Sequence, residues 1–137
     1  MSDPSLEVQK AMFGAMRAAN VAGGRVYDQV PVAPVTFPYV TIGDCQVLPD
    51  KADCIDGSIV YPQVDVWTRS TGYPETTGYP ETKQITSAVL AALDDQPLSV
   101  DGYHLVVFEF QDIRYLRDPD GITRHGVIMF HGLLNPI

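Results

Sequence analysis

The chain has 137 residues, of which 45% are hydrophobic and 19% charged, a composition typical of one folded domain spanning residues 1–137 and unlike that of a disordered chain. Its 17 acidic and 9 basic side chains give a formal net charge of -8. Because Lys and Arg form no block, the sequence disfavours specific nucleic-acid binding.

A helix is predicted over about residues 4–20. Asp3-Pro4 supplies an N-cap and a proline at the first helical position, and Gly23-Gly24 marks the end. Between them apolar side chains recur at helical spacing: Val8, Met12, Ala15, Met16 and Ala19. The start of the chain carries two acids before its first lysine and no uninterrupted apolar run, so it predicts neither a signal peptide nor a membrane anchor. We therefore expect a cytoplasmic product that does not contact a membrane.

The next segment predicts strands separated by an extended connection and a loop. Residues 25–30 predict a short strand, and the three prolines of 31–38 favour an extended connection. Residues 37–48 predict a strand that places Val40 and Ile42 on one face. After it, PDKADCIDGS at 49–58 has the composition of an acidic, turn-rich loop, which carries Asp50, Asp53 and Asp56.

A strand at 59–69 shows strict alternation. Val60, Val64 and Val66 occupy one face, and Tyr61, Asp65 and Trp67 occupy the other. One face should therefore be core, while the other is partly polar or packed against a neighbour.

The hexapeptide TGYPET occurs at 71–76 and again at 77–82. Gly and Pro favour turns, and a tandem copy is tolerated where extra length clashes with nothing, so we place it in an exposed loop. A duplication without a function of its own and a contact segment both remain open. A second helix should follow at about 80–94, starting at Pro80. Its apolar stripe is Ile85, Val89, Ala92 and Leu93.

Two turn signals divide the last part of the chain. Asp101-Gly102 predicts a hairpin turn between residues 98–100 and the strand after it, and Asp118-Pro119-Asp120-Gly121 predicts a second turn. The second turn should join two long strands, 104–116 and 122–134. The whole chain thus predicts an α+β fold, in which two α-helices pack on a mostly antiparallel sheet of five or six strands.

Candidate catalytic residues are few. Cys45 and Cys54 are the only cysteines, and they predict either reduced thiols or a disulfide formed after release into an oxidising medium. Neither state implies catalysis. No G-x-S-x-G, P-loop or GxGxxG motif is present, so the sequence predicts no enzyme and no cofactor.

Neither the histidines nor the loop acids have the spacing of a known metal site. His125 and His131 lie six residues apart on one strand, roughly 20 Å at about 3.3 Å per residue, which is too far to share an ion. Asp44, Asp50, Asp53 and Asp56 lack the calcium-loop spacing of an EF-hand, which favours a solvated acidic loop over a metal site. The acids of the 118–121 turn are predicted to form the turn and to pair with the nearby arginines, which are Arg114, Arg117 and Arg124.

Three phrases carry a resemblance to a known family: FPYVTIGD, VDVWTR and YLRDPDGITRHGVIMF. Together with the order of elements they resemble the tail-completion family of long-tailed phages, in the version found in gene transfer agents of alphaproteobacteria. The resemblance implies a tail terminator, a ring usually of six copies that ends the tail tube and joins it to the head connector or stopper protein. It also implies assembly in the host cytoplasm, a final place in the neck of the virion or gene transfer agent particle, and passage of DNA without specific binding.

A closed ring requires two unlike contact patches on each subunit. Asp65 and Trp67 are candidates for a lateral patch, with a core position for Trp67 as the alternative. The predicted loops at 44–57 and 70–80 are candidates for docking to the tube or connector. They contain Asp44, Asp50, Asp53, Asp56, Tyr73 and Tyr79. A head-side adaptor or stopper, and a small enzyme using the acidic loop as a metal site, are the alternative functions.

Overall fold

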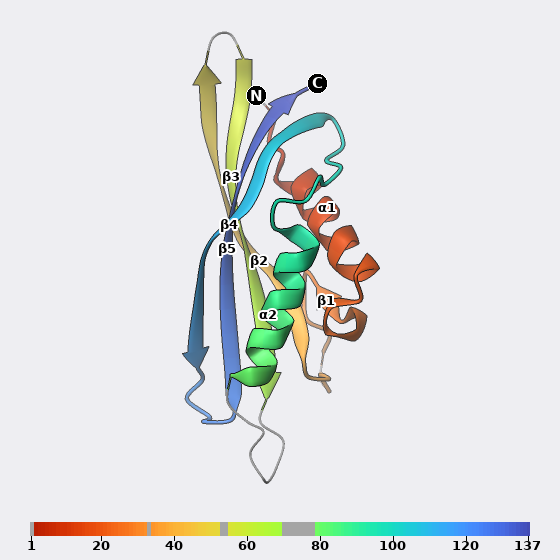
Figure 1. Cartoon of the computed structure of the whole chain (residues 1–137), viewed down its shortest axis with the longest axis vertical. Helices are drawn as coiled ribbons and strands as arrows, with labels where there is room; N and C mark the ends of the chain where they lie inside the picture. Colours follow the sequence, from red (N-terminus) through yellow and green to blue (C-terminus); the bar gives the residue numbers. More distant parts are fainter. Residues whose placement is uncertain (1, 33, 53–54, 70–78) are drawn as a thin grey trace.

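The computed structural model describes residues 2–32, 34–52, 55–69 and 79–137 (Figure 1). Within these ranges no helix is long and apolar enough to cross a membrane. The elements in chain order are α1 (Ser5–Ala18), a short 3-10 helix (Val21–Gly24), β1 (Val26–Tyr27), β2 (Tyr39–Ala52), β3 (Ile55–Arg69), α2 (Pro80–Leu93), β4 (Tyr103–Arg117) and β5 (Thr123–Pro136).

The five strands form one sheet in the order β1-β2-β3-β5-β4. All neighbours are antiparallel except β1 and β2, which are parallel. Both helices lie on the same face of this sheet, so the molecule has two layers (Figure 1). The predicted α+β fold is confirmed.

The core lies between the helices and the sheet. Val60, Val64 and Val66 of β3 are fully buried there, as their alternation predicted. The partners from the other elements are also buried, namely Val8, Met12 and Met16 of α1, Val89 and Leu93 of α2, and Ile128 and Phe130 of β5. Each helix therefore buries the centre of its predicted apolar stripe, whereas Ala19 lies beyond the end of α1 and is exposed.

The acidic loop predicted at 49–58 is wrong. β2 and β3 continue into this segment as a long hairpin, with Pro49 opposite Ser58, Asp50 opposite Gly57 and Lys51 opposite Asp56. Its turn-forming composition suggested a loop, but pairing along the neighbouring strand satisfies the backbone groups in an extended conformation. In Figure 1 this hairpin extends past the helices at one end of the molecule.

The hairpin predicted at Asp101-Gly102 forms only in part. The turn does form, with Gly102 at φ +83° and the Tyr103 N–H donating to the Val100 carbonyl over 3.1 Å. Residues 98–100, however, pair with no strand in the described part of the chain, and Val100 is instead buried in the core. β4 pairs with β5 through the second predicted turn, which places that turn at the end of the molecule opposite the β2–β3 hairpin (Figure 1).

Candidate functional site

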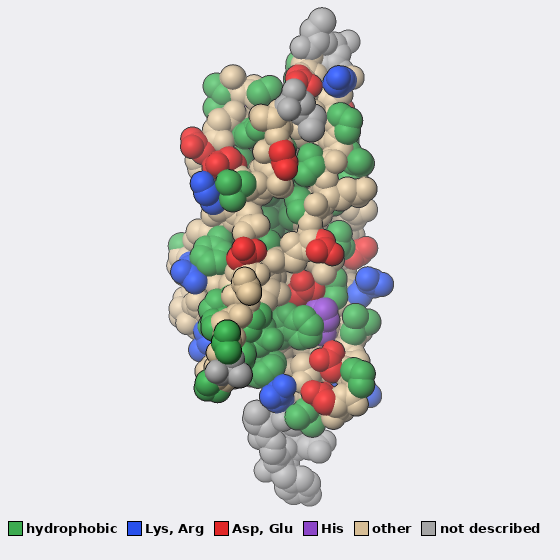
Figure 2. Space-filling view, turned by 180° about the vertical axis from the view of Figure 1, so that it is seen from behind, with side chains coloured by type: hydrophobic (Ala, Val, Ile, Leu, Met, Phe, Trp, Pro, Cys, Tyr) green, Lys and Arg blue, Asp and Glu red, His purple; other side chains and the backbone are tan. Residues whose placement is uncertain are grey.

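The sheet face that the helices leave uncovered carries the polar and aromatic residues that alternate with the core. We call it the open face, and Figure 2 shows the molecule from this side, behind the view of Figure 1. Hydrophobic side chains gather in the lower half of that view beside a histidine, and acidic side chains are scattered around them. Its central residues are Gln63, Asp65 and Trp67 of β3 and His125, Val127 and Met129 of β5, which lie opposite one another in the register.

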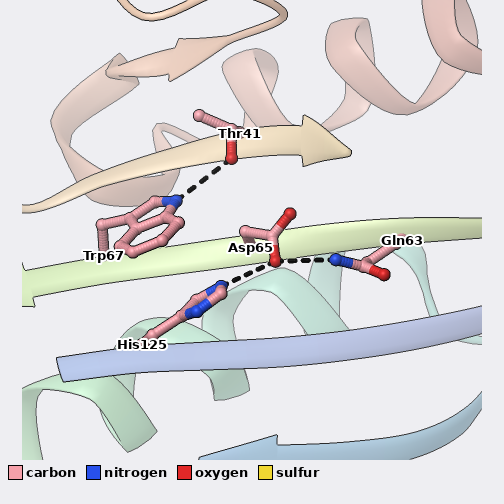
Figure 3. Close-up of polar contacts among 5 residues, drawn as sticks. All are labelled: Thr41, Gln63, Asp65, Trp67 and His125. Carbon is pink, nitrogen blue, oxygen red and sulfur yellow. Dashed lines mark hydrogen bonds and ion pairs between the residues drawn. The ribbon is translucent and has the colours of Figure 1, made fainter. Parts of the chain in front are cut away.

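Asp65 is the centre of a polar cluster on the open face (Figure 3). Its side chain approaches two neighbours: Oδ1 accepts a hydrogen bond from Gln63 Nε2 over 2.9 Å and lies 2.7 Å from His125 Nε2. Asp65 is only 6% exposed. A carboxylate in such a position is stabilised by these partners, because an unpaired buried charge is costly. The cluster joins β3 to β5 across the sheet.

β2 makes room for this carboxylate at a bulge. The pairing of β2 with β3 shifts between Ile42 and Cys45, and Gly43 lies inside the shift. A Cβ atom at Gly43 would lie 2.5 Å from Asp65 Oδ2, closer than real Cβ contacts allow. The absence of a side chain at Gly43 therefore permits the buried position of Asp65.

Trp67 belongs to an aromatic row on the open face and not to the core under the helices. Its ring stacks on His125 with centroids 3.8 Å apart and an interplanar angle of 12°, and Tyr39 stacks on it at 6.3 Å. The indole N–H donates to Thr41 Oγ1 over 3.2 Å (Figure 3). Phe37 continues the row at 5.0 Å from Tyr39. Trp67 is thus fixed from both sides and remains partly exposed.

Two adjoining hollows mark the other half of the open face. One has a volume of ≈ 270 Å³ and is lined by Tyr61, Glu109, Phe110, Gln111 and His131. The other, of ≈ 350 Å³, shares Tyr61 and Gln111 with the first. Both are open to solvent and partly apolar, which suits the side chains of a neighbouring protein better than an enclosed small-molecule site.

The comparisons with known proteins identify the family. Residues 10–134 match the sequence profile of the family described as "Tail completion protein gp17". The chain belongs to this tail completion family.

One curated relative agrees with that assignment, and a solved structure shares the fold. The tail completion protein gp17 of Bacillus phage SPP1 is 30% identical over 99 residues, which cover 72% of this chain and 69% of the phage protein. A chain in the solved virion of a native gene transfer agent particle shares the fold with a TM-score of 0.85. That match has 22% sequence identity and covers 98% of this chain and 99% of the other. The resemblance that the three sequence phrases indicated is confirmed.

The contact residues predicted for this tail completion protein do not form a single site. Asp44 is exposed beside the β2 bulge, whereas Asp50 and Asp56 lie on the paired strands of the hairpin. Tyr79 lies beyond the opposite end of β3, directly before α2. The predicted contacts Asp53 and Tyr73, like the cysteine Cys54, lie outside the described residues.

The β4–β5 turn is held by its own residues. The Asp120 carboxylate accepts hydrogen bonds from the Thr123 hydroxyl over 2.6 Å and from the N–H groups of Thr123 and Ile122. These donors lower the pKa of Asp120 to about 2. The predicted arginine partners are wrong, because within the described chain no arginine forms an ion pair with this acid. Arg124 instead donates to the Gly121 carbonyl.

Two contacts of predicted residues were not evident from the sequence. They are the contact of Asp65 with His125, 60 positions away, and the contacts of Tyr79 with the cations near it. The sequence contains no signal for the first pairing, since the register between β3 and β5 joins segments far apart in the chain. Over the described ranges, no three His, Cys, Asp or Glu side chains are placed to hold a metal ion, and Cys45 is exposed.

Proposed function

We propose that this tail completion protein is the terminator of a tail tube: it caps the tube, stops its polymerisation and joins it to the head connector. Its role is structural and uses surfaces, without catalysis or a cofactor. Membership of the family over residues 10–134 supports the placement in the tail. The observation that carries the proposed ring is the presence of two unlike open edges on one sheet.

The two edges differ in position and in what covers them. β1 pairs only with Val40 and Thr41, so on the side away from β3 the rest of β2 has no strand beside it among the described residues. On the other side β4 is the outermost strand, and residues 94–95 bind its backbone only at Phe108 and Phe110. Open strand edges readily pair with another chain. Two unlike edges suit a head-to-tail contact, which closes into a ring when the rotation allows it.

We propose a ring of about six copies in the particle. Each copy carries a formal charge of -8, so six copies would carry six times that charge, or -48. An acidic channel repels passing DNA instead of holding it. DNA would thus pass through the ring without specific binding.

The two ends of each subunit suit two different neighbours. Asp44, Asp53 and Tyr73 remain proposed contacts from the sequence alone. Asp50 and Asp56 on the β2–β3 hairpin, and Tyr79 directly before α2, are the proposed contacts with the tube and the connector. They lie at opposite ends of the sheet (Figure 1). Trp67 remains the proposed lateral contact. Asp65 is already bonded within the chain, so we propose that it positions His125 and Trp67 for that contact.

Particles produced without this chain provide the main test. We expect electron microscopy to show separate heads and tails, with tails of irregular length. Fully joined particles would refute the proposal. In complete particles, a ring of this protein in contact with the head side but not with the tube would instead assign it to the head-side adaptor.

Variants at the edge of β4 test the ring. Val106 and Leu116 of β4 are 57% and 44% exposed, and Leu6 of α1, 57% exposed, provides a matched control. We expect V106K and L116K to prevent ring assembly at tube ends and L6K to leave it intact, as seen by native mass spectrometry of the complexes. Equal effects of all three substitutions would exclude the β4 edge as a specific contact.

A further inference from the structure

Three cationic side chains converge on one aromatic ring at the start of α2. Lys83 Nζ, Arg117 Cζ and Arg124 Cζ lie 5.9, 5.5 and 5.9 Å from the centroid of the Tyr79 ring. Tyr115 packs edge-on against Tyr79 with centroids 5.6 Å apart, and Lys83 also lies 5.3 Å from its centroid. We call these five residues the Tyr79 cluster. They come from α2, the end of β4 and the start of β5.

The cations of the Tyr79 cluster lack an acidic partner among the residues that the structure describes. Across the described part of the chain, no carboxylate forms an ion pair with Lys83, Arg117 or Arg124. Arg124 Nε is buried and makes no hydrogen bond. The nearby Asp120 is already occupied by Thr123 and backbone N–H groups. Three of the nine basic residues of an acidic chain therefore gather at one ring, and no described carboxylate forms an ion pair with them.

We propose that the Tyr79 cluster is a docking site for an acidic segment of a partner protein, which places a carboxylate among the three cations. Cation–π contacts hold these side chains near the rings while leaving their charge available. A carboxylate would add charge-assisted hydrogen bonds, and the two tyrosines would add apolar contact area. The inference rests on the proposed function in one respect: the partner is a protein of the neighbouring layer of the particle.

The surroundings favour a protein carboxylate over a DNA phosphate chain. Glu81, Asp118 and Asp120 flank the cluster in sequence, and the whole chain has a net charge of -8. DNA binding requires neutralisation of a row of phosphates, and the flanking acids oppose a polyanion. One or two carboxylates at the end of a polypeptide segment need only the three central cations.

Binding of a fluorescently labelled peptide that carries two adjacent glutamates in a Gly/Ser background to the full chain tests the site. We expect the double variant K83Q/R117Q to raise the Kd by about fivefold or more, as for the loss of two partly exposed charge contacts. The control variant K10Q/K51Q removes two exposed lysines elsewhere and should leave the Kd unchanged. Proton NMR should show peptide-induced shifts at the Tyr79 and Tyr115 rings.

Three results of the binding assay would overturn the proposal: no peptide binding, equal weakening in the control, or tighter binding of a short duplex DNA. The last outcome would assign the cluster to phosphate. Tail joining by K83Q/R117Q distinguishes the two proposals. If this variant loses peptide binding but still joins heads to tails, the docking site is refuted while the terminator function stands.

Discussion

Replacing Asp65 with alanine tests whether the polar cluster on the open face stabilises the fold. The substitution leaves Gln63 and His125 without the oxygen that lies 2.9 and 2.7 Å from them. A buried group deprived of its partner costs about 1–3 kcal/mol, and because both partners are only partly buried we expect a total loss of about 2–4 kcal/mol. At about 4 °C per kcal/mol for a domain of this size, Tm should fall by about 8–16 °C.

Urea unfolding followed by tryptophan fluorescence is the appropriate assay, because Trp67 is the only tryptophan and stacks on His125. D65N keeps one acceptor oxygen, so its loss should be less than half that of D65A. D112A removes an exposed carboxylate from β4 and should change stability by less than about 0.5 kcal/mol. If D65A matches D112A in stability and leaves the fluorescence of the folded state unchanged, the cluster has no structural role.

Three further predictions concern the repeat, the core and a turn. Deleting 71–76 should leave Tm within about 2 °C of wild type, since the retained copy supplies the contacts of Tyr79; a large decrease would refute this. G132A should lower the free energy of unfolding in urea by about 1–3 kcal/mol, because its Cβ would lie 3.0 Å from a carbon of the Phe108 ring. G14A, whose Cβ would have nothing within 4 Å, should raise it by about 0.5–1 kcal/mol. NMR titration should give Asp120 a pKa of about 2. The stabilising effect of the ionised carboxylate is fully present above the unfolded-state pKa and is lost as the pH falls through about 2. A titration midpoint near 3.8 would exclude the observed hydrogen bonds.

The two segments that differ from the sequence prediction, 49–58 and 98–100, differ for the same physical reason. Residues 49–58 have the composition of a loop, yet 49–52 and 55–58 are extended because each strand supplies the other with hydrogen bonds. The turn signal at Asp101-Gly102 favoured a hairpin with residues 98–100, yet no strand of the described chain lies beside them, and Val100 contributes to the core instead. In both cases the conformation depends on which distant segment is adjacent, which local propensity does not contain.

The candidate sites were predictable only in part. The alternation in β3 placed Asp65 and Trp67 on the face opposite the core, and that placement is correct. It contained no information about their partners. The proximity of His125 to Asp65, and of Arg117 and Arg124 to Tyr79, arises from strand register and from the packing of α2 against the sheet.

The sequence by itself determined the α+β fold class, the two helices, the buried faces of the main strands and the family. These follow from periodicity, turn residues and short phrases, which are local features of the chain. The tertiary structure alone decided the length of the β2–β3 hairpin, the two open edges, the buried carboxylate next to Gly43 and the gathering of three cations around Tyr79. Each of these depends on contacts between segments far apart in the chain, whose energies are fixed only when the sheet register and helix packing are set.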